Sequence, residues 1–309
     1  MEKKILLAVD GSIHSKHAIQ YAVKMASVVR DFTCTLLHVQ PAISQFLLDE
    51  ARTDFKAKDE LKRVIRRNGE DAQRMLEKYK AQMERMGIGE ECIDMVTQPR
   101  LLGLAKDILQ RAQEGLYDAI VVGRRGLSRA QKAFMGSVTG KLVEHSRVIP
   151  VWMVDGEVTS TRIIMAVDGS ECSLRALDHL SFVIEQNPKL SVTLFHVMPR
   201  FRNYCVIDFD EKETEIQRVI AKGDKQCIDR FYARALGKFK AAGIQEKQIE
   251  IKVVERAVNV GKAIVDEAKK GNYGTVVIGR RGASKAFFMG SVSRYVLDKT
   301  SNRALWLVS

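Results

Sequence analysis

The sequence Val121-Val-Gly-Arg-Arg-Gly126, continued after nine residues by Gly136-Ser-Val138, occurs twice in this chain. The second copy reads Val277-Ile-Gly-Arg-Arg-Gly282 and continues at Gly290-Ser-Val292 after only seven residues. In each copy an apolar run ends at a glycine, and the later Gly-Ser predicts the start of a helix. A strand, a glycine-rich loop and a helix N-terminus together favour phosphate, because backbone N–H groups and the helix dipole attract an anion. The pattern therefore predicts a duplicated α/β domain with a phosphate-binding loop.

The duplication extends along both halves of the chain. Ile5–Ser12 matches Ile163–Ser170, and Thr35–Val39 matches Thr193–Val197. Trp152 and Trp306 lie at matching places in the last apolar run of each half. At 309 residues the chain is long enough for two cores. We predict two domains, residues 1–155 and 160–309, joined by a short linker.

Each half alternates predicted strands and helices. The strands expected in the first half are Lys4–Val9, Thr33–Val39, Ile93–Thr97, Tyr117–Val122 and Val148–Val154; the helices are 12–28, Glu70–Met86, Leu101–Gln113 and Ser137–His145. This order predicts parallel βαβ units in an open sheet covered by helices on both faces. Ligands of such sheets bind outside the carboxyl ends of the strands, where Asp10, Val39 and Gly123 fall.

Two segments that follow the second strand of each half, 40–68 and 198–223, are unlike each other. Their sequences give no basis for choosing between a lid and a partner surface. The helix Glu70–Met86 that follows the first of them carries apolar residues at helical spacing, so its methionines are expected to face the core.

Composition limits the classes of protein that the chain can represent. It is 46% hydrophobic and 28% charged, and no apolar stretch approaches the roughly 20 residues of a membrane span. We therefore expect a cytoplasmic protein without membrane contact. The net charge of +12 is spread over both halves, with 25 basic against 20 acidic residues in 1–156 and 25 against 18 in 157–309. Without a basic tail or a nucleic-acid motif, this charge indicates a surface that favours anions rather than a nucleic-acid site.

The five cysteines are odd in number and form no Cys-x-x-Cys pair. They support neither a disulfide framework nor a zinc site. No metal site made by protein side chains alone is predicted.

The repeated motifs supply the candidate site residues. Gly123 and Gly126 would let the backbone turn and approach an anion without a Cβ in the way. Ser137 could cap its helix and also donate its hydroxyl to a phosphate oxygen. Asp10 ends a buried strand, where a carboxylate needs a partner; a nucleoside ligand and an Asx-type turn with Ser12 both remain open.

Other motif residues have two interpretations each. Val39 would offer its backbone to a base, and the preceding His38, like His196 in the second half, is expected to be a core histidine bonded to backbone. Arg124 could bind phosphate or lie at a solvated loop tip, and the same alternatives hold for the other loop cations, Arg125, Arg129, Lys132, Arg280, Arg281 and Lys285.

Asp-Gly-Ser after the first strand, His-Val at the end of the second and Gly-x2-Gly-x9-Gly-Ser after the fourth resemble the universal stress protein family, and two such domains resemble its tandem members. The resemblance implies an adenine nucleotide alpha-hydrolase-like fold, with five parallel strands in the order 3-2-1-4-5. It implies ATP (or ADP or AMP) with Mg²⁺ at Asp10, Val39, Gly123, Gly126, Gly136, Ser137 and Val138. It also implies that the last strands, Val148–Val154 and Arg303–Val308, pair within the molecule; further assembly into a homodimer stays open.

The second half departs from the family pattern because seven residues, not nine, separate Gly282 from Gly290. Two residues represent up to roughly 7 Å of extended chain. The matching positions are Asp168, Val197, Gly279, Gly282, Gly290, Ser291 and Val292. They are expected to form a tighter site or none.

Three functions remain open at this level. The first is a stress-response or signalling protein that binds nucleotide without rapid turnover. The second is a slow ATPase or phosphotransferase, although the sequence has no Gly-x4-Gly-Lys-Ser/Thr motif. The third is an interaction module that carries no ligand.

Overall fold

The computed structural model describes residues 1–124, 137–199, 213–281 and 289–309, without the side chains of 137, 199, 213–221, 224 and 256. The first half contains β1 (Lys3–Ala8), α1 (Ile13–Ala26), β2 (Phe32–Val39), α2 (Gln45–Glu50), α3 (Phe55–Arg85), β3 (Ile93–Gln98), α4 (Leu104–Glu114), β4 (Ala119–Gly123), α5 (Ser137–His145) and β5 (Val151–Asp155). The second half contains β6 (Ile163–Val167), α6 (Glu171–Val183), β7 (Val192–Pro199), α7 (Glu213–Ala241), β8 (Ile249–Ala257), α8 (Val260–Lys270), β9 (Thr275–Gly279), α9 (Ser291–Lys299) and β10 (Arg303–Val308).

All of these strands belong to one ten-stranded sheet, in the order β3-β2-β1-β4-β5-β10-β9-β6-β7-β8. Within each half the strands are parallel and the predicted order 3-2-1-4-5 is confirmed. The two five-stranded sheets are continuous because the last strands of the two halves pair, as the family resemblance implies, with β5 and β10 in antiparallel register. The last strand of the first half begins at Val151 rather than Val148, since Pro150 restricts the residue before it and Val148 is exposed.

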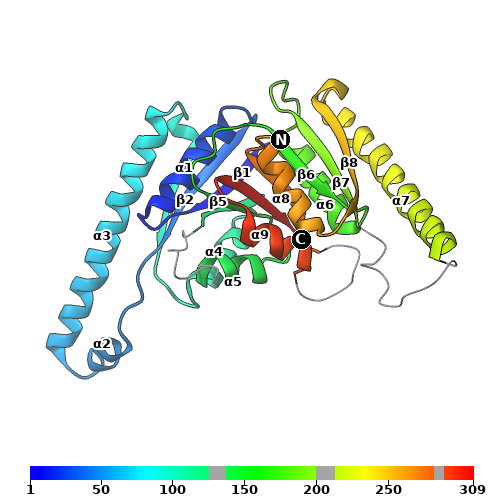
Figure 1. Cartoon of the computed structure of the whole chain (residues 1–309). Helices are drawn as coiled ribbons and strands as arrows, with labels where there is room; N and C mark the ends of the chain where they lie inside the picture. Colours follow the sequence, from blue (N-terminus) through cyan, green and yellow to red (C-terminus); the bar gives the residue numbers. More distant parts are fainter. Residues whose placement is uncertain (125–136, 200–212, 282–288) are drawn as a thin grey trace.

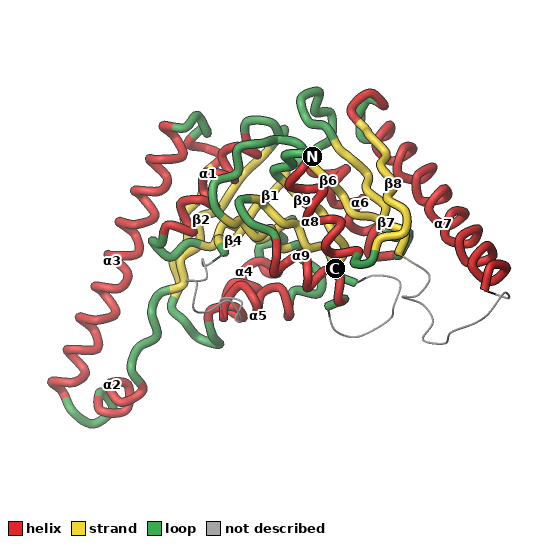
Figure 2. The backbone as a smooth tube through the Cα atoms, viewed as in Figure 1, coloured by secondary structure: helices red, strands yellow, loops and turns green. Residues whose placement is uncertain are grey.

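Helices cover both faces of the sheet (Figures 1 and 2). One apolar cluster joins one sheet face to α1, α3, α6 and α7. The other cluster joins the opposite face to α4, α5, α8 and α9. Both clusters include residues of both halves, so the halves share their core.

Two stacked tryptophans lie where the halves meet. Trp152 of β5 and Trp306 of β10 face each other across the antiparallel pair, with ring centroids 4.0 Å apart and planes 3° from parallel. Trp152 donates its indole N–H to His179 Nε2 at 3.0 Å, and Trp306 donates to Tyr21 Oη at 2.8 Å. Tyr21 and His179 occupy matching positions of α1 and α6. Each half therefore supplies the acceptor for the other half's tryptophan.

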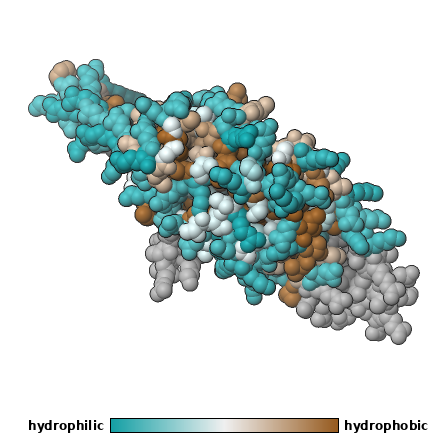
Figure 3. Space-filling model, turned by 90° about the horizontal axis from the view of Figure 1, so that it is seen from above, coloured by the Kyte–Doolittle hydropathy of each residue, from teal (hydrophilic) through white to brown (hydrophobic). Residues whose placement is uncertain are grey.

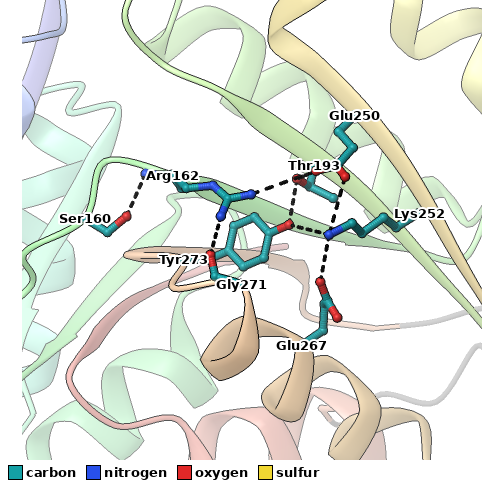
Figure 4. A network of polar contacts seen from close by, with 8 residues as sticks. All are labelled: Ser160, Arg162, Thr193, Glu250, Lys252, Glu267, Gly271 and Tyr273. Carbon is teal, nitrogen blue, oxygen red and sulfur yellow. Dashed lines mark hydrogen bonds and ion pairs between the residues drawn. The ribbon is translucent and has the colours of Figure 1, made fainter.

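A polar network closes the amino-terminal edge of the second half's strands (Figure 4). The Arg162 guanidinium lies 4.5 Å from the Tyr273 ring centroid, and the Tyr273 hydroxyl donates to Thr193 Oγ1 at 2.9 Å. The first half repeats this arrangement with Lys4 at the Tyr117 ring and the Tyr117 hydroxyl on Thr35. Because these contacts lie at the strand starts, they support the sheet at the end opposite the strand ends where ligands are expected.

The helix predicted over Glu70–Met86 is α3, which begins earlier, at Phe55, and faces the core only over its C-terminal part. Only Ala72, Leu76, Tyr79 and Met83 of α3 are buried, and its first four turns project away from the sheet with α2 at their tip (Figure 1). Figure 3 shows mostly hydrophilic residues over this projecting end. Intrahelical ion pairs such as Arg66–Glu70 and Arg67–Asp71 accompany the extension. The expectation for the methionines fails at Met86, which follows the helix and is exposed.

Candidate nucleotide pocket

One pocket opens at the carboxyl ends of β1, β2 and β4, between the N-terminal turns of α1 and α4. Its lining is Ala8, Val9, Asp10, Ser12, His14, Ser15, Leu37, Val39, Leu104, Ile108, Val122, Gly123, Val138 and Thr139. Four sequence-predicted site residues from separate segments, Asp10, Val39, Gly123 and Val138, are therefore brought together.

The Asp10-Gly11-Ser12 segment forms a tight turn at the edge of this pocket. Asp10 Oδ1 accepts the Ser12 N–H at 3.1 Å and the Ser15 hydroxyl at 2.8 Å. Ser12 then caps α1 by accepting the Ser15 N–H at 3.3 Å. Gly11 has φ +79°, a conformation that side chains other than glycine adopt with strain. The Asx-type turn considered from the sequence is thus present.

The premise that Asp10 is buried is wrong. β1 ends at Ala8, Val9 is buried, and Asp10 is exposed at the pocket rim. Its carboxylate therefore does not require a ligand for burial, although its position allows one. Burial raises the pKa of the Tyr79 hydroxyl on α3, and the nearby Asp10 carboxylate is the second cause, so Tyr79 stays protonated beside this turn.

The second half builds the same turn. Asp168 Oδ1 accepts the Ser170 N–H at 3.0 Å and the Ser173 hydroxyl at 2.6 Å, and Gly169 has φ +73°. Asp168 is exposed, like its counterpart. The turn is therefore a property of the duplicated scaffold, and its presence alone does not distinguish a ligand-binding half.

The strand ends also repeat between the halves. Val39 and Val197 are buried near the carboxyl ends of β2 and β7. The preceding histidines bond to backbone: His38 Nδ1 lies 2.8 Å from Val9 O, and His196 Nδ1 lies 2.8 Å from Val167 O. The predicted bond to backbone is confirmed for both histidines; His196 is buried, whereas His38 is partly buried and does not line the pocket.

Gly123 is needed for a reason that differs from the one expected. A Cβ at this position would lie 2.3 Å from the His14 carbonyl oxygen, so the glycine allows β4 to pass close under the first turn of α1. Gly279 also lies close to the first turn of α6: a Cβ added at Gly279 would lie 2.9 Å from the Cys172 Cβ. Helix packing alone is therefore enough to require glycine at these two positions.

Arg124 fits neither interpretation considered from the sequence, because it does not line the pocket and it does not lie at a solvated loop tip. It is 8% exposed; its Nη1 donates to Thr300 O at 2.7 Å and its Nη2 to Asp298 O at 3.1 Å, at the C-terminal end of α9 in the other half. Arg280 is placed reciprocally, with Nη1 donating to Ser146 O at 2.8 Å beyond α5. These carbonyls end helices, where a cation is favourable. Arg124 therefore joins the halves and leaves the set of proposed nucleotide ligands.

The remaining loop predictions fall largely outside the described residues. Gly126, Gly136 and Gly282 lie there, with the loop cations Arg125, Arg129, Lys132 and Lys285. Ser137 begins α5, but its side chain is among those not described. In the second half, Gly290 is the N-cap of α9 and donates its N–H to Arg280 O at 3.2 Å; Ser291 is exposed and Val292 packs against the core.

Several lining residues were missed from the sequence. Ser15 has a readable signal, because Asp-Gly-Ser-x-x-Ser recurs at Asp168–Ser173. Thr139 has another, because Gly136-Ser-Val-Thr139 recurs as Gly290-Ser-Val-Ser293. In the structure the Thr139 hydroxyl donates to Gly123 O at 3.4 Å, and the Ser293 hydroxyl donates to Gly279 O at 2.9 Å. His14, Leu104 and Ile108 carry no such signal, because only the fold brings their helices to the pocket.

Within the described residues there is no group of three or more His, Cys, Asp or Glu that could hold a metal ion. No helix among them is long and apolar enough to cross a membrane.

The sheet order, the duplicated turn and the pocket at the strand ends define a tandem α/β protein with a pocket over the strand ends of its first half. A family model described as the universal stress protein family matches residues 1–155 and again 159–305. The chain belongs to the universal stress protein family and carries two copies of its domain.

Two relatives identified by sequence each match about half of this chain. The chain is 30% identical over 157 residues to universal stress protein YxiE of Bacillus subtilis (strain 168). The aligned segment covers 50% of this chain and 99% of that relative. It is 26% identical over 155 residues to a universal stress protein A-like protein of Arabidopsis thaliana, spanning 46% of this chain and 85% of the relative. A universal stress protein crystal structure from Archaeoglobus fulgidus DSM 4304 superposes over 99% of this chain and 98% of its own, with TM-score 0.65 and 20% identity, and so supports the fold.

Proposed function

We propose that this protein binds an adenine nucleotide in the pocket of its first half and acts in a stress response or in signalling without rapid catalysis. One observation carries the proposal: Asp10, Val39, Gly123 and Val138, predicted as site residues from separate segments, line a single pocket. Its place at the carboxyl ends of parallel strands is the usual ligand site of open α/β sheets.

The described part of the pocket fits a nucleoside. Leu37, Val39, Leu104, Ile108 and Val122 give it an apolar wall on which a base can pack. The Asp10 carboxylate stands exposed at the rim, held in place through Oδ1 by Ser12 and Ser15. A carboxylate so fixed can accept hydrogen bonds from ribose hydroxyls.

The phosphate part of the proposal rests on the sequence. The nine-residue spacing between Gly126 and Gly136 is that of the nucleotide-binding pattern, and α5 begins directly after it at Ser137. ATP, with Mg²⁺ held through its phosphates, is the proposed ligand; ADP and AMP would share the nucleoside contacts. The helix N-terminus favours the phosphate charge.

We propose weaker binding in the second half. Its loop is two residues shorter, and the residues that match the pocket lining differ in shape and polarity: Phe195 stands for Leu37, and Cys172 for His14. Phe195 is buried, and its larger side chain takes up room that the leucine leaves to the pocket.

The first test is to extract nucleotide from the purified full-length chain and then follow phosphate release from added ATP. Co-purified adenine nucleotide without sustained turnover is expected. Sustained turnover that Ser137→Ala abolishes would instead support an ATPase. A protein that emerges empty and shows no affinity in an ATP titration would support the interaction module.

The second test compares the halves by calorimetric titration with ATP. Asp10→Ala with Gly126→Val is expected to remove most of the binding, and Asp168→Ala with Gly282→Val to remove less. Thermal unfolding of both variants checks that the fold persists. Greater damage from the second-half pair would show that the shortened loop is the functional one.

A further inference from the structure

A second hollow lies between α4 and α5, on the side of those helices away from the nucleotide pocket. Its lining is Arg100, Leu102, Gly103, Leu104, Ala105, Lys106, Leu109, Val138, Lys141 and His145. Leu104 and Val138 also line the nucleotide pocket, so two side chains form the wall between the sites. We name this hollow the α4–α5 groove.

The α4–α5 groove has an apolar floor and a basic rim. Leu102, Leu104, Leu109 and Val138 provide apolar surface, and Leu102 is 63% exposed. The rim carries Arg100, Lys106, Lys141 and His145, and none of the described lining residues is acidic. Within the described part of the chain, Arg100, Lys106 and Lys141 form no ion pair, so their charges are available to an anionic partner.

The exposed leucines at one end of the groove are held in place. The buried Asp107 carboxylate accepts the Leu101 N–H at 3.0 Å and the Leu102 N–H at 2.8 Å. α4 begins later than the sequence predicts, at Leu104 instead of Leu101, and these bonds fix the Leu101 and Leu102 backbone just before it, with both side chains exposed. A fixed apolar surface rimmed by polar side chains is typical of an interaction site.

The second half shows what a closed version of this groove looks like. Gly261 of α8 matches Ala105, and Tyr295 of α9 matches Lys141. A Cβ on Gly261 would meet Tyr295 Cβ and Cδ1 at 2.9 Å, so the tyrosine packs directly on the glycine and its ring joins the core. The same scaffold position therefore holds a ring in one half and a lysine in the other.

We propose that the α4–α5 groove is a docking site for an acidic amphipathic helix of a partner protein. On α5, Val138, Lys141 and His145 are spaced by three and four residues, so they lie on one face along two turns, or about 10 Å. Cations stand on both helices along this length. A ligand with one charged head group would use one end only, whereas a helix with acids flanking an apolar stripe complements the whole groove.

The test uses a fluorescein-labelled synthetic peptide of about 14 residues, with leucines at helical spacing and glutamates elsewhere, in anisotropy titrations with the full chain. A matched peptide with lysines in place of glutamates is the control for charge. The acidic peptide is expected to bind more weakly as salt is raised, and the basic peptide not to bind.

The second half supplies the matched variants. Ala105→Gly with Lys141→Tyr copies the closed arrangement and is expected to weaken acidic-peptide binding at least about tenfold. Lys141→Gln removes only the charge and is expected to weaken it about two- to threefold. Tyr295→Lys with Gly261→Ala copies the open arrangement into the second half and is expected to add a second binding site.

Each remaining outcome overturns the proposal. If the Ala105→Gly, Lys141→Tyr variant binds as well as Lys141→Gln, the peptide does not occupy the groove. If a single-stranded oligonucleotide of equal charge competes as well as unlabelled acidic peptide, the surface recognises only charge. Thermal unfolding of each variant, expected to stay near that of the parent protein, shows that loss of binding is not loss of fold.

Discussion

The two halves of this protein keep the same skeleton and differ where side chains face open space. Both form the Asp-Gly-Ser turn and the histidine–carbonyl bond, and both bury an arginine in the other half. The differences lie over the strand ends, where Leu37 is matched by Phe195, and between the last two helices, where Lys141 is matched by Tyr295. Contacts to backbone have been retained in both halves, whereas single residues that line the two hollows, such as Leu37 and Lys141, have changed.

The largest effect is expected where the halves are most alike, at the stacked tryptophans. Trp152→Ala and Trp306→Ala should each lower the free energy of unfolding by about 4 kcal/mol, because each ring is fully buried and each indole N–H has an acceptor. Denaturant unfolding followed by circular dichroism measures both. Trp152→Phe and Trp306→Phe, which keep most of the buried surface, should cost less.

Unequal losses of unfolding free energy in Trp152→Ala and Trp306→Ala would contradict the equivalence of the two halves. If one alanine variant unfolds like the parent protein while the other is strongly destabilised, the stack does not act as a shared contact between the halves.

An intermediate effect is expected at the reciprocal arginines. Arg124→Met should lower the free energy of unfolding by about 2 kcal/mol, since two hydrogen bonds from a buried cation are lost, and Arg280→Met should have a similar effect. ATP titration of Arg124→Met should give an affinity close to that of the parent protein. Loss of affinity without loss of stability would return Arg124 to the nucleotide site.

The sequence was sufficient for the fold because both copies carry the same pattern. Alternating apolar runs and helical spacing predicted the element order, and the repeated motifs predicted where Asp10, Val39 and Gly123 would meet. Arg124 shows what such patterns omit: its position in sequence beside a phosphate-binding loop is equally suited to a helix end in the other half. That helix end is more than 170 residues away along the chain, and no local pattern shows which direction the side chain takes.

The projecting half of α3 marks a second limit. Its residues have no core face, so periodicity gives no signal, and the helix instead carries charged pairs spaced by three or four residues. Burial also misled at Asp10, because the first strand ends at Ala8, one residue earlier than expected, and the Asp10 carboxylate lies in solvent.

The smallest predicted effect is a pH dependence of stability, which arises because the two halves use different residues, Tyr21 and His179, as indole acceptors. Tyr21 and His179 accept the two indole N–H groups at matching positions, but only histidine has an ordinary pKa near neutrality. Burial lowers the pKa of His179 to about 3 from its ordinary 6.5. Below about pH 6.5 the unfolded chain therefore binds a proton that the folded chain does not, so stability falls as the pH falls towards 3 and is constant for this group above 6.5. Because part of His179 remains exposed, we expect about 1 kcal/mol per pH unit rather than the full 1.4.

Replacing the histidine by its counterpart should remove this dependence. His179→Tyr copies the first half, and His179→Gln keeps an acceptor for the Trp152 N–H without a group that titrates in this range. Between pH 6.5 and 5, the parent protein should lose about 1.5 kcal/mol more stability than either variant, as measured by urea unfolding at each pH. A parallel decline in all three proteins would mean that His179 is readily protonated in the folded state, and that the two acceptors are electrostatically equivalent after all.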